Sequence, residues 1–488
     1  MRVLLVYANR SRDLTAAPPV GLSYVATAAR DAGHEVALVD LLVADDPDGA
    51  LRRAVQERRP EVVGISVRNI DSASKQRPGW QMGDVARHIE TVRASGSARV
   101  VLGGPAVSVL GPAVLESLSA DYAVVGEGEI AFPALLRVLE RGEPVRGIPG
   151  VYGRRPSGVH GTEPDRLAGF GRSGMERWID WPAYRRRGGT WAIQTKRGCP
   201  LHCVYCAYPA IEGAQLRRRT PQEVADEIEH VMATVRPKTF EIVDSTFNVP
   251  ISHAMEICEE ITRRNLRVRL TTMGVNPIGV TAELFAAMRR AGFRSMMVSP
   301  DAASEATLGS LKKGFTVPEL RKTAGLAKAS GMRSAWFFIL GGPGETRETV
   351  DETMRFVETE LNHPRCLTIV MTGVRILPGT EMAALAVRER IVPHDHDYAA
   401  PTFYVSPAVD ETWILGRVQR ALARNPGVVH AGEQNLSRSE RLLGAVLQAL
   451  GVAPPYWCYL PLLLRMPPLR QLRRRFPPAF AAPAPPGC

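Results

Sequence analysis

The chain has 488 residues, of which 45% are hydrophobic and 23% are charged. This length corresponds to roughly two to four domains, and the composition excludes a wholly disordered, collagen-like or coiled-coil chain. No apolar run approaches the ~20 residues that cross a bilayer, and the N-terminal segment becomes polar too early for a signal peptide. We therefore expect a cytoplasmic protein without a transmembrane segment.

The charge is unevenly distributed along the chain. The net charge is +11, and the segment from Arg465 onward holds five arginines and no acidic residue. A basic chain could bind nucleic acid, but no recognition motif and no interleaving of aromatic and basic residues is present, so we expect no nucleic-acid partner. The aromatic, Leu-rich and basic stretch at 454–480 could make a peripheral contact with an anionic membrane or pack against the rest of the protein, and we favour packing.

Strand and helix patterns alternate through residues 1–150. Each of five Val- and Leu-rich runs is followed by a stretch with helical spacing, which predicts a parallel sheet covered by helices on both faces. We therefore expect a doubly wound, Rossmann-like α/β domain. The predicted strands occupy residues 2–7, 35–42, 61–67, 99–104 and 121–126.

Unusual residues collect where these strands end. Ligands bind doubly wound sheets at the carboxyl ends of the strands, and glycine there lets the backbone approach a ligand closely. Any one site could be an ordinary turn, but four on one edge favour a large, extended ligand. No G-x-G-x-x-G follows the first strand, which argues against a nicotinamide dinucleotide. The candidate binding residues are Pro19, Gly21, Leu22, Ser66, Arg68, Asn69, Gly103, Gly104, Pro105, Gly126, Glu127, Gly128 and Glu129.

Three of the seven cysteines lie within eight residues. Cys199, Cys203 and Cys206 form a C-x-x-x-C-x-x-C array, which indicates a metal site in a reducing compartment rather than a set of disulfides. Three thiolates on one loop can hold three irons of a [4Fe–4S] cubane and leave the fourth iron open. A zinc site is the alternative, but it requires a fourth ligand, and His202 does not have the spacing of a zinc ribbon.

The sequence around these cysteines, RGCPLHCVYCAYP at 197–209, resembles the cluster loop of radical S-adenosylmethionine enzymes. The resemblance implies that the open iron chelates S-adenosylmethionine, which the reduced cluster cleaves to a 5′-deoxyadenosyl radical. The protein then positions the cofactor and excludes competing reactions. The resemblance also implies an electron donor such as a flavodoxin or ferredoxin.

Six apolar runs, separated by amphipathic helical stretches, make up the middle of the chain. Six β/α units are too few for a closed eight-stranded barrel, so we expect a partial (β/α)6 TIM-type barrel at 189–390 with its chemistry at the C-terminal edge. Residues 151–188 are predicted to be a linker, and residues 391–488 a small, mainly helical substrate or capping region. The predicted strands occupy residues 191–195, 240–245, 268–273, 295–299, 334–340 and 366–374.

The resemblance also implies roles for individual residues of the barrel. Tyr205 resembles the aromatic residue whose backbone meets adenine, and Asp244 takes the place of the motif that meets the methionyl amino group. Ser299 and Asp301 resemble the element that contacts the ribose. A Gly/Pro-rich segment expected near the adenine contains Gly341, Gly342, Pro343 and Glu345.

Three further segments have alternative interpretations. The Gly/Pro-rich segment could equally be a turn in which Thr346 caps the next helix, and the two interpretations are compatible. The arginine runs at 185–187 and 217–219 could bind an anionic substrate or a reductant, but we favour solvated faces. Residues 401–407 lie where substrate contacts are common in the family, and Tyr404 is the candidate catalytic residue.

With both halves considered, residues 1–410 resemble the cobalamin-binding radical S-adenosylmethionine enzymes of the class B methyltransferase type. The resemblance implies that the N-terminal domain holds cobalamin. The D-x-H-x-x-G motif that supplies an axial histidine is absent after the first strand, so the cobalt should lack that ligand. Arg68 and Asn69 are candidates for the lower face of the corrinoid, or else belong to a solvated loop.

The resemblance implies methyl transfer to an unactivated carbon of a small-molecule, natural-product intermediate. Methylcobalamin would supply the methyl group, and the deoxyadenosyl radical would activate a carbon that has no lone pair. Ring contraction, cyclisation or rearrangement by a cobalamin-binding relative is the alternative. A methylthiotransferase would require a second cysteine-ligated cluster before residue 199, where there is no cysteine. A non-enzymatic electron carrier would usually place four cysteines around a small cluster.

Overall fold

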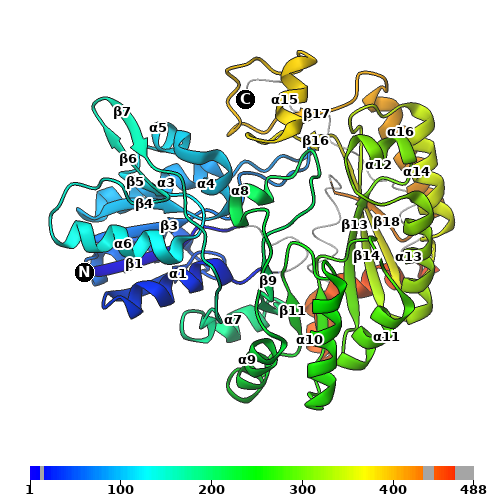
Figure 1. Ribbon diagram of the computed structural model, residues 1–488, viewed down its shortest axis with the longest axis horizontal. Helices are drawn as coiled ribbons and strands as arrows, with labels where there is room; N and C mark the ends of the chain where they lie inside the picture. The colour runs from blue at the N-terminus through cyan, green and yellow to red at the C-terminus, as the bar shows by residue number, and fades with distance from the viewer. Residues whose placement is uncertain (11–15, 432–443, 468–488) are drawn as a thin grey trace.

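The computed structural model describes residues 1–10, 16–431 and 444–467. Figure 1 shows two α/β units side by side, the first in blue and cyan and the second in green, yellow and orange. None of the helices in the described ranges is long and apolar enough to cross a membrane.

The first unit is built on a seven-stranded sheet. Its strands are β1 (Arg2–Tyr7), β2 (Glu35–Asp40), β3 (Val62–Ser66), β4 (Arg99–Gly103), β5 (Tyr122–Val124), β6 (Val151–Arg155) and β7 (Gly158–Gly161). Its helices are α1 (Val20–Asp31), α2 (Pro47–Arg58), α3 (Met82–Ser95), α4 (Pro105–Leu110), α5 (Val114–Leu118) and α6 (Gly128–Glu140).

The strand order is β2-β1-β3-β4-β5-β6-β7, and the first five of these strands are parallel. Side chains of β1 alternate between two cores, because Val3 and Leu5 pack with α1 and α6 while Leu4 and Val6 pack with α2 and α3. Helices therefore cover both faces, and the doubly wound prediction is confirmed. The order reverses between β1 and β3, which is the position where such sheets bind ligands.

The hairpin β6–β7 pairs antiparallel with β5 and extends the first sheet beyond residue 150. The segment predicted as a linker therefore begins with sheet structure. Both strands are short and rich in Gly and Arg, so they lack the apolar alternation that identifies a strand from sequence.

The second unit contains the six predicted strands and one more. In sheet order they are β8 (Trp191–Ile193), β11 (Phe240–Ile242), β12 (Leu270–Thr272), β13 (Ser295–Asp301), β14 (Arg333–Leu340), β15 (Cys366–Thr372) and β18 (Val428–His430). The helices between them are α9 (Pro221–Thr234), α10 (Ile251–Arg263), α11 (Ala282–Ala291), α12 (Glu305–Ser310), α13 (Val317–Ser330), α14 (Arg347–Thr359) and α16 (Glu411–Arg424).

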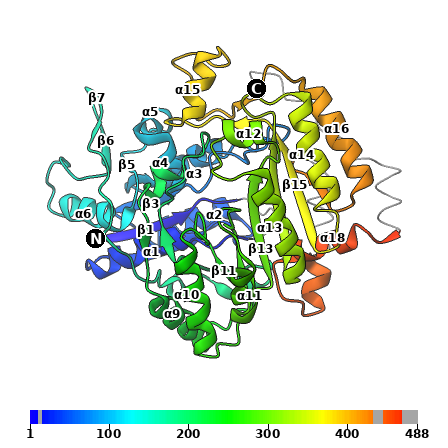
Figure 2. The same ribbon diagram turned by 45° about the vertical axis from the view of Figure 1, so that its right-hand side comes forward.

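All seven strands run parallel, as in a partial TIM-type barrel. Figure 2 shows α13, α14 and α16 in a layer outside the strands. The added strand β18 comes from the region predicted to be mainly helical, and it pairs with β15. Shorter elements flank the barrel: α7 (Trp181–Arg185), β9 (Lys196–Arg197), α8 (Tyr208–Glu212), β10 (Arg217–Arg218), β16 (Val374–Arg375), α15 (Glu381–Arg388), β17 (Phe403–Tyr404) and α18 (Leu460–Leu463).

Local sequence fixes where several barrel helices begin. Thr220 and Glu223 form a reciprocal capping box at the start of α9, with Pro221 at the first helical position. The side chain of Thr346 accepts a hydrogen bond from the backbone N–H of Thr349 at the start of α14, so the predicted cap is confirmed. Each barrel strand from β8 to β15 is followed by a helix before the next strand of the barrel begins.

The segment 456–464 closes the N-terminal end of the barrel. Trp457, Cys458 and Leu460 are buried against strand residues that face the barrel interior, among them Ala335 and Ile369. The hydroxyl of Thr239 donates a hydrogen bond to the carbonyl of Pro454 at 2.6 Å, which fastens the same stretch to the start of β11. For the described part of 454–480 the prediction of packing is confirmed, whereas residues 468–488 lie outside the described residues.

Replacing Trp457 with alanine should lower the free energy of unfolding by about 3–5 kcal/mol, because it leaves a cavity in the core of the barrel. Leu462→Ala is the matched control, since Leu462 lies on the same segment but is 55% exposed; its effect should stay within about 0.5 kcal/mol. Guanidinium denaturation measures both values. Equal losses in the two variants would contradict the placement of this segment.

Candidate functional site

The carboxyl ends of the two sets of parallel strands face each other. The loop from β3 to α3 (67–81) reaches the barrel, where Asp71 accepts a hydrogen bond from Arg375 at 2.7 Å. Lys75 and Gln76 of the same loop donate to the carboxylate of Glu411, at the start of α16. On the other side of the junction, α8 contacts α4. The predicted ligand-binding edge and the predicted cluster loop therefore lie in one region.

The cluster loop consists of residues 198–207, between β9 and α8, and its backbone is held in place at several points. The N–H of Cys199 donates to the carbonyl of Gly213 at 3.2 Å, and the N–H of Val204 donates to the carbonyl of Leu311 at 3.2 Å. Gly198 has a φ of +87°, and a Cβ there would lie 2.0 Å from the carbonyl oxygen of Gln215. Only glycine fits this position, which explains the glycine one residue before Cys199.

The three thiols of the loop are buried or half-buried. Burial raises the pKa of all three thiols, that of Cys206 to about 11, so without a metal they keep their protons at neutral pH. Iron binding must displace these protons, as for any thiolate site. Among the described residues, no group of three His, Cys, Asp or Glu side chains could hold a single metal ion. A cubane spreads its ligands over several irons, so three soft sulfur donors on one constrained loop fit it.

Tyr205 and Asp301, which were predicted to meet the adenine and the ribose respectively, contact each other in the structure. The hydroxyl of Tyr205 donates to the carboxylate of Asp301, and Lys313 forms an ion pair with the same carboxylate at 2.6 Å. Burial lowers the pKa of Lys313, but the charge and hydrogen bond of Asp301 together with the charges of Cys203 and Cys206 outweigh it, and the net pKa is raised. Both contacts are made to the same oxygen of Asp301, Oδ2. Ser299, on the same strand, is exposed and open to a ligand.

Asp244 connects two barrel strands at their carboxyl ends. It accepts hydrogen bonds from the backbone N–H groups of Thr195 at 2.7 Å and Lys196 at 3.2 Å and from the hydroxyl of Thr195. Its neighbour Ser245 donates to the carbonyl of Gly198 in the cluster loop at 3.0 Å. The hydrogen bonds of Asp244 therefore hold the ends of β8 and β11 together next to the cluster loop. Both of its carboxylate oxygens have protein partners.

The Gly/Pro-rich segment follows β14 and folds around the buried side chain of Glu345. One oxygen of Glu345 accepts hydrogen bonds from the backbone N–H groups of Gly341 and Gly342, while the other has no partner among the described residues. Burial raises the pKa of Glu345 to about 7. Pro343 takes part through its carbonyl, which accepts from Ser310 at 2.7 Å. The segment is thus a rigid turn at the barrel's C-terminal edge.

The first sheet offers a similarly built edge. Gly104 has a φ of +95°, and a Cβ there would lie 2.7 Å from the carbonyl oxygen of Val67, so the backbone of this turn requires glycine. In the neighbouring β3–α3 loop, the side-chain oxygens of Ser74 and Gln76 are buried, and neither Ser74 Oγ nor Gln76 Oε1 has a hydrogen-bond partner in the described chain. Buried orphan oxygens next to a glycine turn fit a large ligand that carries many polar groups, such as a corrinoid.

Arg68 lies at the junction itself. It is half-buried and makes no hydrogen bond or ion pair with the rest of the described chain. Burial raises the pKa of Tyr7 at the end of β1, of Tyr208 after the cluster loop and of Glu241 in β11, and the positive charge of Arg68 opposes each of these rises. Arg68 is therefore within electrostatic reach of the first sheet, the cluster loop and the barrel. Its neighbour Asn69 is also half-buried.

The remaining candidates of the first edge have simpler positions. Ser66 is buried at the end of β3, and Leu22 packs in the core between α1 and α6, where it cannot face a ligand. Gly128 lets α6 approach Val25 of α1, since a Cβ there would lie 2.8 Å from that side chain. The other candidates lie close to the starts of α1, α4 and α6: Pro19 precedes α1, Gly21 and Pro105 lie in the first turns of α1 and α4, Gly103 ends β4, and Gly126 lies in the turn before α6.

Three predicted functional residues have other partners. Glu127 and Glu129 form ion pairs with Arg197 and Arg217 of the hairpin that flanks the cluster loop, so their carboxylates do not face a cofactor. Tyr404 is 1% exposed, and its hydroxyl donates a hydrogen bond to Glu389 at 2.7 Å. A buried hydroxyl that is already hydrogen-bonded argues against a catalytic role.

Several residues that shape this region were not among the predicted site residues. Lys313, Arg197 and Arg375 are buried cations that join distant segments. The run 217–219 was predicted to be solvated, but Arg217 and Arg219 are buried in ion pairs with Glu127 and Glu227. Local sequence contains no signal for these pairs, because each partner lies on a different element.

Replacing Cys199, Cys203 and Cys206 together with alanine should abolish iron and sulfide uptake and the visible absorption of the reconstituted protein, because the three irons that the loop would hold lose their cysteine ligands. Cys258→Ala is the control: this thiol is buried on α10, outside the site, and the variant should take up iron normally. Iron analysis and absorption spectroscopy after anaerobic reconstitution provide the test. Full iron content in the triple variant would refute the assignment of the cluster loop.

Comparison with known proteins identifies both units. Residues 193–357 match the family model of the Radical SAM superfamily, and residues 13–136 match that of the B12 binding domain. The chain is 26% identical to an uncharacterized methyltransferase of Pyrococcus horikoshii over 73% of this chain and 78% of that protein. It is 27% identical to tryptophan 2-C-methyltransferase of Streptomyces laurentii over 75% and 71% of the two chains. The anaerobic magnesium-protoporphyrin IX monomethyl ester cyclase of Rubrivivax gelatinosus is 26% identical over 73% and 65%.

The similarity extends over both units of the fold. The radical S-adenosylmethionine methyltransferase TsrM from Kitasatospora setae, solved with cobalamin and a [4Fe–4S] cluster bound, superposes with a TM-score of 0.81 at 25% identity, over 97% of this chain and 99% of that chain. Together with the two family matches, this agreement confirms the resemblance inferred from the cluster loop. The chain belongs to the radical S-adenosylmethionine enzymes that carry a B12-binding domain.

Proposed function

We propose that this protein is a cobalamin-dependent radical S-adenosylmethionine methyltransferase that methylates an unactivated carbon of a small natural-product intermediate. The observation that carries the proposal is the junction, where the cluster loop and the glycine-lined edge of the first sheet face each other through α8 and α4. When bound, the two cofactors would supply a transferable methyl group and the radical that activates the substrate. The chain's own residues position and enclose them.

We assign the cluster to Cys199, Cys203 and Cys206. Tyr205, Lys313 and Asp301 form a buried hydrogen-bonded group that holds the loop against the barrel and keeps a positive charge beside the thiolates. Such a charge stabilises the anionic form of the sulfur ligands. Ser299 and the turn at Gly341 and Gly342 are the contacts we propose for S-adenosylmethionine at the barrel's open end.

We assign cobalamin to the edge formed by the loops after β1, β3 and β4. Ser74 and Gln76 would satisfy their buried oxygens with amide N–H groups of the corrinoid, and the glycine turn at 103–104 would let the backbone approach it. Arg68 and Asn69 are the proposed residues at the lower face of the cobalt. A guanidinium offers no acceptor lone pair, so Arg68 would not itself be a metal ligand.

The partners and the location follow from the same chemistry. Splitting S-adenosylmethionine requires an electron, so we propose a small reductant of the flavodoxin or ferredoxin type and a cytoplasmic location. The cyclase relative keeps a second candidate function open, namely ring formation or rearrangement without methyl transfer. Both candidates require the same two cofactors, and they differ in the products that leave the enzyme.

The two candidates can be separated without knowing the substrate. Protein reconstituted anaerobically with iron, sulfide and hydroxocobalamin is reduced with titanium(III) citrate and mixed with S-adenosylmethionine that is isotopically labelled on its methyl group. Mass spectrometry should find labelled methylcobalamin and S-adenosylhomocysteine in equal amounts. Release of 5′-deoxyadenosine with neither product would refute methyl transfer and favour rearrangement. Failure to bind hydroxocobalamin would refute both candidates.

A further inference from the structure

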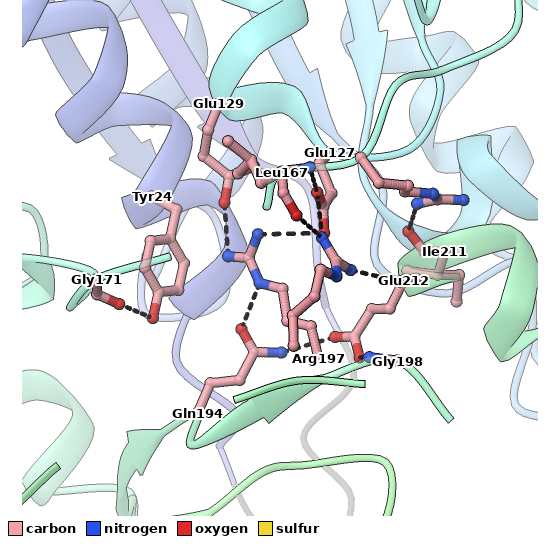
Figure 3. Close-up of polar contacts among 12 residues, drawn as sticks. Tyr24, Glu127, Glu129, Leu167, Gly171, Gln194, Arg197, Gly198, Ile211 and Glu212 are labelled. Atoms are coloured by element: carbon pink, nitrogen blue, oxygen red, sulfur yellow. Dashed lines mark hydrogen bonds and ion pairs between the residues drawn. The ribbon is translucent and has the colours of Figure 1, made fainter. Parts of the chain in front are cut away.

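Two arginines beside the cluster loop are buried against the first α/β unit. Arg197 lies on β9, two residues before Cys199, and pairs with Arg217 across the β9–β10 ladder. Their side chains are 5% and 10% exposed. In Figure 3 the guanidinium of Arg197 points towards the start of α6, where Glu127 precedes the helix and Glu129 lies in its first turn.

The four side chains form a network of ion pairs between the two units. Arg197 Nη2 lies 2.6 Å from Glu129, and its Nη1 lies 3.4 Å from Glu127. Arg217 Nη1 lies 2.6 Å from Glu127. Two positive charges thus face two negative charges in a region with little solvent exposure, so removing any one of them leaves a buried charge without its partner.

The guanidinium of Arg197 is held by more than charge. It lies 4.7 Å from the ring centroid of Tyr24 on α1 and 4.4 Å from that of Phe170. Its Nε donates to the side-chain oxygen of Gln194 at 3.0 Å. Aromatic contact and a fork of directed N–H donors are features of arginine that a lysine cannot reproduce.

The network continues into both ends of the segment that carries the cysteines. Gln194 donates to one oxygen of Glu212 at 2.6 Å, and the N–H of Gly198 donates to the other oxygen at 3.1 Å. Arg217 donates to the backbone carbonyl of Glu212. The entrance of the cluster loop at Gly198 and the end of α8 at Glu212 are therefore attached to the same two carboxylates of the first unit (Figure 3).

We propose that Glu127, Glu129, Arg197 and Arg217 form an interdomain clamp that fixes the position of the cluster loop relative to the carboxyl edge of the first sheet. The inference rests on the proposed function, in which that edge holds cobalamin. The four side chains are positioning residues, since they are engaged with each other and not with the open end of the barrel. The clamp determines how far the two cofactor sites lie from each other, and the affinity for each cofactor is determined elsewhere.

The test uses Arg197→Met, which removes the charge and the directed donors while keeping most of the side-chain volume. Arg417→Met is the matched control, because Arg417 is also buried and pairs with two carboxylates, Asp351 and Glu358, but lies between α14 and α16. Both proteins are reconstituted with iron, sulfide and hydroxocobalamin and poised so that the reduced cluster and cob(II)alamin are paramagnetic. Electron paramagnetic resonance then measures their magnetic interaction, which depends on the inverse cube of their distance.

Arg197→Met should bind both cofactors in wild-type amounts, show a broadened or lost magnetic interaction, and form S-adenosylhomocysteine about 100-fold more slowly, as expected for a misplacement of about 1 Å. Arg197→Lys should restore the interaction only in part, and Glu129→Gln should have a smaller effect of the same kind. Arg417→Met should keep the wild-type interaction, even if it unfolds more easily. An unchanged interaction in Arg197→Met would refute the clamp.

A second measurement keeps the clamp separate from the proposed function. Hydrogen–deuterium exchange of the protein without cofactors should be faster at 198–213 in Arg197→Met than in the wild type, and faster only around α14 and α16 in Arg417→Met. If the wild type fails to bind hydroxocobalamin, the proposed function is wrong while exchange at 198–213 still decides whether the clamp exists. Wild-type exchange at 198–213 in Arg197→Met would rule the clamp out.

Discussion

Parallel strands place all of their C-terminal loops at one edge, and in this protein two such edges share a single junction. The β3–α3 loop reaches Arg375 and Glu411 on the barrel side, and the β5–α6 turn reaches Arg197 and Arg217. Polar side chains that are enclosed between two folded units require partners, because an unpaired buried charge is costly. The ion pairs and the few unpaired oxygens of the junction both result from this constraint. The paired groups join the units, and the unpaired oxygens are the ones that we propose a bound cofactor would satisfy.

Much of the architecture could be predicted from local sequence. The parallel strands of both units are apolar runs with β-branched residues, and capping residues such as Thr220 and Thr346 mark the following helices. The hairpin β6–β7 and strand β18 were not predicted. They are three to five residues long, and their strand conformation depends on pairing with β5 and β15, which are distant in sequence. Tertiary pairing of this kind leaves no periodic pattern in so short a segment.

The same contrast between local sequence signals and long-range contacts applies to the residues of the site. Cys199, Cys203 and Cys206 were identifiable because the ligands of a cluster can come from one loop, so their spacing in the sequence is enough to indicate a cluster site. The roles of Glu127 and Glu129 were not identifiable, since a carboxylate at a strand end can face either a ligand or an arginine, and Arg197 lies 68 residues from Glu129. Tyr404 was assigned by its position in the chain, whereas its hydroxyl is bound to Glu389 inside the protein. A pattern in sequence thus locates an edge, but it does not determine which way each side chain points.

The segment 456–464, which closes the N-terminal end of the barrel, also has a consequence for biosynthesis. Residues 456–464 follow every barrel strand in the chain, yet they fill the interior between those strands. The first α/β unit can fold while the ribosome is still translating the barrel, because domains fold as units beginning from the N-terminus. The barrel core, in contrast, stays incomplete until Trp457 has left the ribosome. Maturation of the iron site would therefore follow release of this segment, on a first unit that has already folded.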